Sequence, residues 1–107
     1  MRRAPRPGAV TPLPVIDGGF AAVEAEVIWR LGSDAPADRS GWNADDALKL
    51  VESLHIGVEF AASPMAQINA LGPTVVASDF GNNGGLILGP AIDGGLTRDP
   101  AGLVCET

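Results

Sequence analysis

The chain has 107 residues, which is the size of one small domain. Hydrophobic residues make up 46% of it, enough to form a core and to argue against wholesale disorder. The net charge of −6 argues against nucleic acid as a partner, because nucleic-acid-binding proteins present a basic face. Cys105 is the only cysteine, so it rules out an intramolecular disulfide, and we expect its thiol to be inert.

No stretch of the sequence reaches the roughly 18 apolar residues that a membrane-spanning helix needs, so no membrane partner is expected. The N-terminus is interrupted by prolines and lacks the apolar run of a signal peptide. These features predict a soluble, cytoplasmic protein. Residues 1–19, rich in Pro and Gly, are predicted to form an irregular arm before a domain over residues 20–107.

Apolar and polar residues alternate over residues 23–31, which predicts a strand. One of its faces is apolar, and the other carries Glu24, Glu26, Ile28 and Arg30. A loop is expected over residues 32–43. An amphipathic helix is then predicted from Asn43 or Ala44 to His55, with His55 as a C-terminal cap and Gly57 ending the helix.

Shorter elements are predicted in the second half of the chain. The patterns favour strands at residues 56–61, 74–77 and 86–88, the second because it is β-branched. A short helix is expected from Pro64 to Leu71, with Ser63 as its N-cap. The Gly- and Asn-rich residues 78–85 are predicted to form a loop.

Three glutamates are the main candidates for a functional site. Glu24 and Glu26 project from one face of the predicted strand, roughly 6.5–7 Å apart along the backbone. Two carboxylates at this spacing repel each other unless a positive charge lies between them. Glu59 lies among apolar residues, where a carboxylate is costly to bury without a partner. Three carboxylates without a soft ligand suit Mg²⁺ or Mn²⁺, although a solvated acidic face with Arg30 as ion-pair partner is the alternative.

Four segments resemble, in order, motifs of the 2-keto-4-pentenoate hydratases and their relatives in the fumarylacetoacetate hydrolase superfamily. These segments are VEAEV at 23–27, LGSDAP at 31–36, GVEF at 57–60 and SDFGNNGGLILG at 78–89. The resemblance covers about residues 20–92. It implies an α+β fold, a mixed β-roll of the fumarylacetoacetate hydrolase C-terminal type with flanking helices. It also implies that Glu24, Glu26 and Glu59 bind Mg²⁺ or Mn²⁺, and that Asp79 and Asn82 lie on a catalytic loop near the substrate.

The resemblance further implies a 2-oxo acid substrate that chelates the ion through its carboxylate and keto oxygens. The cation would stabilise the enolate formed during water addition, retro-Claisen cleavage or decarboxylation. The family's N-terminal segment with a catalytic lysine and its C-terminal strands have no counterpart here, so the resemblance predicts an incomplete roll. Lys49 is the only lysine, expected on a solvent-facing helix surface, and Phe80 stands where the family has Asn. Exposed sheet edges would favour a homo-oligomer.

Three hypotheses remain open from the sequence. The chain is a Mg²⁺-dependent lyase or hydratase, a truncated non-catalytic remnant that at most binds metal, or a small acidic interaction domain. Mg²⁺-dependent activity on a 2-oxo acid separates the first from the others. Metal binding that is lost in Glu59→Gln separates the first two from the third.

Overall fold

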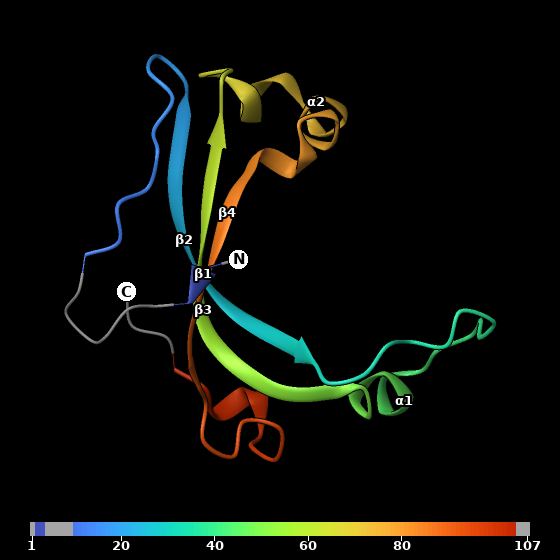
Figure 1. The fold of residues 1–107 in the computed structure, drawn as a ribbon. Helices are drawn as coiled ribbons and strands as arrows, with labels where there is room; N and C mark the ends of the chain where they lie inside the picture. The colour runs from blue at the N-terminus through green and yellow to red at the C-terminus, as the bar shows by residue number, and fades with distance from the viewer. Residues whose placement is uncertain (1, 4–9, 105–107) are drawn as a thin grey trace.

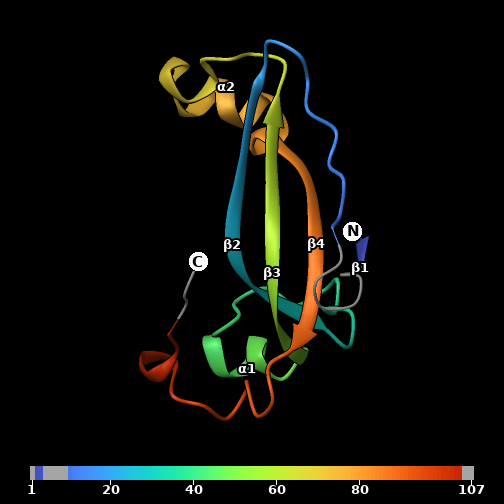
Figure 2. The same cartoon turned by 90° about the vertical axis from the view of Figure 1, so that its left-hand side faces the viewer.

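The computed structural model of the chain describes residues 2–3 and 10–104. Its centre is an antiparallel sheet of three long strands, which lie side by side in Figure 2: β2 (Phe20–Leu31), β3 (Val51–Ser63) and β4 (Asn83–Ala91). The two-residue β1 (Arg2–Arg3) pairs in parallel with β4, so the strand order is β1-β4-β3-β2. Residues 10–16 have no regular secondary structure. The fold is α+β, a small sheet with a few short helices.

The helices are short and lie in the connections between strands. α1 (Ala44–Leu48) precedes β3, and α2 (Pro73–Ser78) lies between the 3₁₀ segments η1 (Ile68–Leu71) and η2 (Phe80–Asn82). A last 3₁₀ segment, η3, spans Pro100–Gly102. Figure 1 shows α1 and α2 on the same side of the bent sheet, near its two ends. No helix of the described residues has the length and apolar character needed to cross a membrane.

The predicted strand at residues 23–31 is confirmed, and it begins earlier, at Phe20. β2 pairs with β3 along its whole length, from Phe20 opposite Ser63 to Leu31 opposite Val51. The strands expected at residues 56–61 and 86–88 are also confirmed, as parts of β3 and β4. Residues 23–31 and 56–61 were recognisable because residues of alternating character recur with the period of two that a strand requires, whereas residues 86–88 form a short run of apolar residues.

The predicted helix that ends at His55 is wrong beyond its first turn. α1 ends at Leu48, and residues 51–55 belong to β3. The helix starts as expected, because the Asn43 side chain accepts a hydrogen bond from the Asp46 backbone N–H at 2.8 Å. Beyond this turn the pairing with β2 decides the structure. Trp29 lies opposite Leu54, and Arg30 Nη1 forms an ion pair with Glu52 Oε2 at 3.0 Å.

The assignments of Gly57 and His55 to a helix terminus are therefore also wrong. Gly57 lies within β3, opposite Glu26, and a Cβ added there would lie 2.0 Å from Ile28 Cδ1. The added Cβ would also lie 2.8 Å from the backbone carbonyl oxygen of Ile87, so the neighbouring strand leaves room only for glycine at this position. His55 Nδ1 donates to the Gly89 carbonyl at 2.9 Å, and its Nε2 lies 2.9 Å from Ser53 Oγ. This ring links β3 to β4 instead of capping a helix.

The predicted strand at residues 74–77 is wrong as well, because these residues form α2. Pro73 occupies the first turn of the helix, where the missing N–H has no intrahelical partner to lose. Gly72, with φ of 94°, allows the chain to turn into the helix. The helix expected over residues 64–71 is reduced to η1. Ser63 is the buried last residue of β3, and its Oγ accepts a hydrogen bond from the Met65 N–H at 3.1 Å.

The core of the described residues is small and follows the central strand. The buried hydrophobic residues are Leu54, Phe60, Ala61, Ile68 and Leu88. Three of them belong to β3, and Leu88 belongs to β4 beside it. The positions of the candidate site residues therefore depend mainly on the long pairing of β2 with β3, because the hydrophobic core is small.

Candidate metal centre

The pairing of β2 with β3 brings the three candidate glutamates to one place on the sheet. Glu24 lies directly opposite Glu59, and Glu26 lies opposite Gly57, two residues before Glu59. Residues directly opposite each other in an antiparallel pair point to the same face, as do residues two apart in one strand. All three carboxylates therefore project from the same face of the sheet.

The carboxylates are close enough to share one ion. One oxygen from each of Glu24, Glu26 and Glu59 can be chosen so that all three lie within 4.8 Å of one another. Glu24 is exposed, whereas Glu26 and Glu59 are half-buried. Like charges placed directly opposite each other on a sheet destabilise it unless something positive lies between them. The arrangement is thus electrostatically strained in the absence of a cation.

The neighbours of the cluster offer little positive charge. Among the residues whose side chains the structure describes, no Lys or Arg forms an ion pair with any of the three glutamates. Arg30, the ion-pair partner considered from the sequence, binds Glu52 on β3 instead. The only described polar contact of the cluster comes from Asn83, whose Nδ2 donates to Glu59 Oε1 at 2.8 Å. This amide orients Glu59 but adds no charge.

Asp79 and Asn82 lie outside the group of converging carboxylates. Asp79 ends α2, where its backbone N–H donates to the carbonyls of Val75 and Val76, and its buried Oδ2 has no hydrogen-bond partner in the described structure. Asn82 lies in η2 with a φ of 50°, and its Nδ2 donates to Asn69 Oδ1 at 3.3 Å. Both precede the first residue of β4, Asn83, so the chain carries this loop directly towards Glu59.

Sequence reasoning missed Asn83 as a contact of the site and did not place Ser53 and His55 on the same strand as Glu59. Asn83 was part of a segment predicted as a loop, although it is the first residue of β4 and pairs with Ala61. His55 and Ser53 lie on the same face of β3 as Glu59, because the three positions differ by even numbers of residues. The period-two pattern that starts at residue 56 could have been extended backwards to find them. Cys105 lies outside the described residues.

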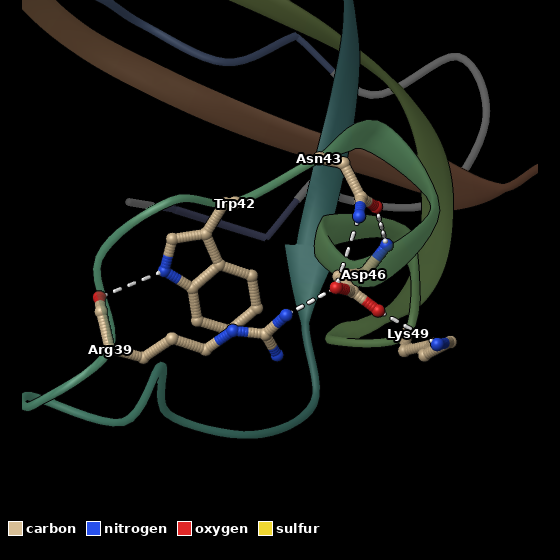
Figure 3. Close-up of polar contacts among 5 residues, drawn as sticks. All are labelled: Arg39, Trp42, Asn43, Asp46 and Lys49. Atoms are coloured by element: carbon tan, nitrogen blue, oxygen red, sulfur yellow. Dashed lines mark hydrogen bonds and ion pairs between the residues drawn. The ribbon is translucent and has the colours of Figure 1, made fainter.

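A second acidic group, around Asp46, shows the contrast with the glutamate cluster (Figure 3). Asp46 Oδ1 accepts a hydrogen bond from Lys49 Nζ at 2.8 Å, and its Oδ2 binds the guanidinium of Arg39. The Arg39 guanidinium also lies over the Trp42 ring, 4.1 Å from its centroid. Lys49, then Arg39, hold the pKa of the Asp46 carboxyl below its ordinary value of 3.8, and the Asn43 amide acts in the same direction. Asp46 is thus paired within the chain, whereas no cationic side chain that the structure describes forms an ion pair with the three glutamates.

Comparison of the chain with models of known protein families, with curated proteins and with solved structures finds no match.

Proposed function

We propose that the chain binds a divalent cation, Mg²⁺ or Mn²⁺, through Glu24, Glu26 and Glu59. The observation that carries this proposal is the convergence of three carboxylates on one face of the sheet. None of them forms an ion pair with a described Lys or Arg side chain. A bound cation would relieve the repulsion between Glu24 and Glu59. The ion would neutralise the glutamates, as the positive charges of Lys49 and Arg39 neutralise Asp46.

The donor set determines which ions suit the site. Three carboxylates are hard oxygen ligands, and the described part of the cluster contains neither His nor Cys. Such a set favours Mg²⁺ or Mn²⁺ over zinc, which normally recruits nitrogen or sulfur ligands. Mg²⁺ commonly keeps several water molecules when a few carboxylates hold it. The exposure of Glu24 leaves room for water or a chelating substrate on the open side of the site.

We extend the proposal to a lyase or hydratase acting on a 2-oxo acid. It is supported by the order of the four motifs that resemble the 2-keto-4-pentenoate hydratases, and by the convergence of the three glutamates that the resemblance names as ligands. The mixed β-roll of that family is part of the same proposal. When bound, the ion would supply Lewis-acid stabilisation of negative charge on the substrate oxygens.

The remaining residues have supporting roles in this proposal. Asp79 and Asn82 would contact the substrate from the loop that leads into β4, because Asn83 immediately follows them and already binds Glu59. Asn83 would hold the Glu59 carboxylate in orientation, since its amide occupies one lone pair of Oε1. The other carboxylate oxygen of Glu59 would then be free to bind the ion.

Metal binding without turnover is the second candidate function, and the environment of Lys49 favours it. The family that the motifs resemble uses a catalytic lysine, and Lys49 is the only lysine of this chain. Its ammonium lies 2.8 Å from Asp46 Oδ1, in the group beside α1. Lys49 is therefore engaged as a structural ion-pair partner, and the chain offers no other amine side chain for proton transfer.

Thermal unfolding with and without Mg²⁺ tests the binding step. A ligand that binds only the folded state stabilises it by about 2.7 kcal/mol at a hundred times its dissociation constant. We expect the midpoint to rise with Mg²⁺ in the wild type and in Glu52→Gln, but not in Glu59→Gln. A panel of 2-oxo acids, assayed with Mg²⁺ and with excess chelator, then separates turnover from binding alone. Thermal midpoints that do not change with Mg²⁺ in any of the three proteins would contradict the proposed metal site.

A further inference from the structure

An apolar face runs along β2 and β3, on the side of the sheet opposite the glutamates. Its large side chains are strongly exposed: Val23 68%, Val27 48%, Trp29 54%, Leu31 58% and Ile56 56%. The first four lie at odd-numbered positions of β2, with the small Ala25 between Val23 and Val27, and Ile56 lies directly opposite Val27. They therefore form one continuous surface, which we call the β2–β3 apolar face. Neighbouring exposed hydrophobic residues on one face indicate an interaction site, whereas scattered ones do not.

The overall dimensions show how much surface the chain leaves uncovered. Its accessible surface is 7921 Å², whereas a compact monomer of this 10.9 kDa mass exposes roughly 5,600 Å². The radius of gyration is 16.5 Å, against about 13 Å for a compact domain of this length. The excess of about 2,300 Å² is spread over the arm, the loops and the sheet, and the five strongly exposed side chains of the apolar face contribute to it.

We propose that the β2–β3 apolar face is the interface with a second copy of this chain, packed sheet against sheet. Two sheets of a sandwich pack about 10 Å apart through their apolar faces, and this would bury the five exposed side chains of both copies. A symmetric dimer needs a surface that complements itself, and the face has no charged residue among Val23, Ala25, Val27, Trp29 and Leu31. Asp45, at the α1 end of the face, is the one acidic residue among the described residues that line the adjoining groove.

The charge distribution favours this face over the other side of the sheet. Each chain carries a net charge of −6, so two copies repel each other where their acidic groups meet. Glu24, Glu26 and Glu59 lie on the opposite face, which would point outwards in this dimer. The proposed metal centre and the proposed interface thus occupy separate faces and do not depend on each other.

One end of the apolar face opens into a groove that would accept a side chain of the second copy. The groove has a volume of about 440 Å³ and lies between β2 and α1, with Trp29, Leu31, Ala47, Leu48 and Val51 among its lining residues. Trp29 and Leu31 belong to both the face and the groove. Large apolar anchors that fill such pockets contribute most to interface affinity. Trp29 is accordingly the residue that we expect to matter most.

Sedimentation equilibrium over a range of protein concentrations tests the proposal. We expect a molar mass of twice 10.9 kDa for the wild type, and a thermal midpoint that rises with protein concentration. The double variant Val27→Lys/Ile56→Lys places two charges in the centre of the face, and we expect its dimer dissociation constant to rise by at least about 100-fold. Val10→Lys/Val15→Lys is the matched control, because these valines are exposed outside the sheet.

Fluorescence of Trp29 gives a readout that does not depend on the fold of the lysine variant. In a Trp42→Phe background, Trp29 is the only tryptophan, so its emission should shift to longer wavelength on dilution of the dimer. Val23→Thr/Val27→Thr keeps β-branched residues in the strand and should weaken dimerisation without unfolding the chain. A folded monomer whose midpoint ignores concentration, or a dimer that the lysine variant leaves intact, would overturn the proposal.

Discussion

Glu24 on β2 and Glu59 on β3 are direct partners in the antiparallel pairing, with both carboxylates on the same face of the sheet. Two like charges in this relationship oppose strand pairing. The described side chains supply an amide from Asn83 but no ion pair to offset the repulsion. The pairing of β2 with β3 must therefore be maintained by its backbone hydrogen bonds and its apolar neighbours.

Removal of one of these charges should stabilise the metal-free chain. In Glu59→Gln the repulsion with Glu24 is lost, while the Asn83 amide can still donate to the Gln carbonyl oxygen. We expect the free energy of unfolding to rise by about 0.2–1 kcal/mol at low ionic strength, measured by urea denaturation in a chelator. Glu52→Gln should have the opposite sign, because it breaks the ion pair with Arg30. A loss of stability in Glu59→Gln would contradict the repulsive cluster.

Gly57→Ala should destabilise the sheet next to the site. The added methyl group would lie 2.0 Å from Ile28 Cδ1 and 2.8 Å from the Ile87 carbonyl oxygen, so the strands must shift. Overpacking of this kind costs about 1–3 kcal/mol, which denaturant unfolding would detect. Gly102→Ala serves as the control, because a Cβ there meets nothing within 4 Å. Equal stability of the two variants would show that β2 and β3 do not pack as described.

Asp46→Asn should lower the thermal midpoint at neutral pH but not in acid. The Lys49 ammonium and then the Arg39 guanidinium lower the pKa of this carboxyl in the folded chain. The folded state therefore binds a proton less readily than the unfolded state, and the contribution to stability is present above pH 3.8. It is lost as the pH falls below that value through the folded pKa. Midpoints of wild type and variant should converge on acidification.

Phe80→Asn should stabilise the turn between α2 and β4. Phe80 has a φ of 53°, in the left-handed region that a bulky residue adopts at a cost, and its side chain is 90% exposed. Asn tolerates this conformation, and little apolar burial is lost with the ring. We expect a gain of roughly 0.5–1 kcal/mol, equivalent to several degrees in the thermal midpoint. Gly81→Ala, at φ of 69°, should shift the midpoint downwards.

Two of the three strands that the sequence predicted correctly have an unambiguous period of two, and the third, at residues 86–88, is a short run of apolar residues. Residues 23–31 alternate so regularly that both the strand and the shared face of Glu24 and Glu26 follow from the spacing. Residues 56–61 alternate in the same way, which gave Glu59 a place on a strand. The direct opposition of Glu24 and Glu59 depends on the register, and no local pattern specifies a register between segments that lie far apart in the sequence.

The errors arose where local propensity and tertiary pairing compete. Val51 and Leu54 fit the apolar stripe of a helix as well as a strand, and only the neighbouring β2 decides between the two. Residues 74–77 are β-branched in part, but Pro73 and Gly72 favour a helix start that outweighed the strand propensity. Asn83 was missed because its contact with Glu59 joins residues 24 positions apart.

Titration of the chain with Mn²⁺, followed by loss of the electron paramagnetic resonance signal of the free ion, tests the central claim most directly. We predict one binding site per chain in the wild type, its loss in Glu24→Gln and in Glu59→Gln, and unchanged affinity in Glu52→Gln. Glu52 is the matched control because it is an exposed glutamate on β3, the strand of Glu59, and lies outside the cluster. Equal affinity for Mn²⁺ in the wild type and all three variants would contradict the assignment of the metal centre to Glu24, Glu26 and Glu59.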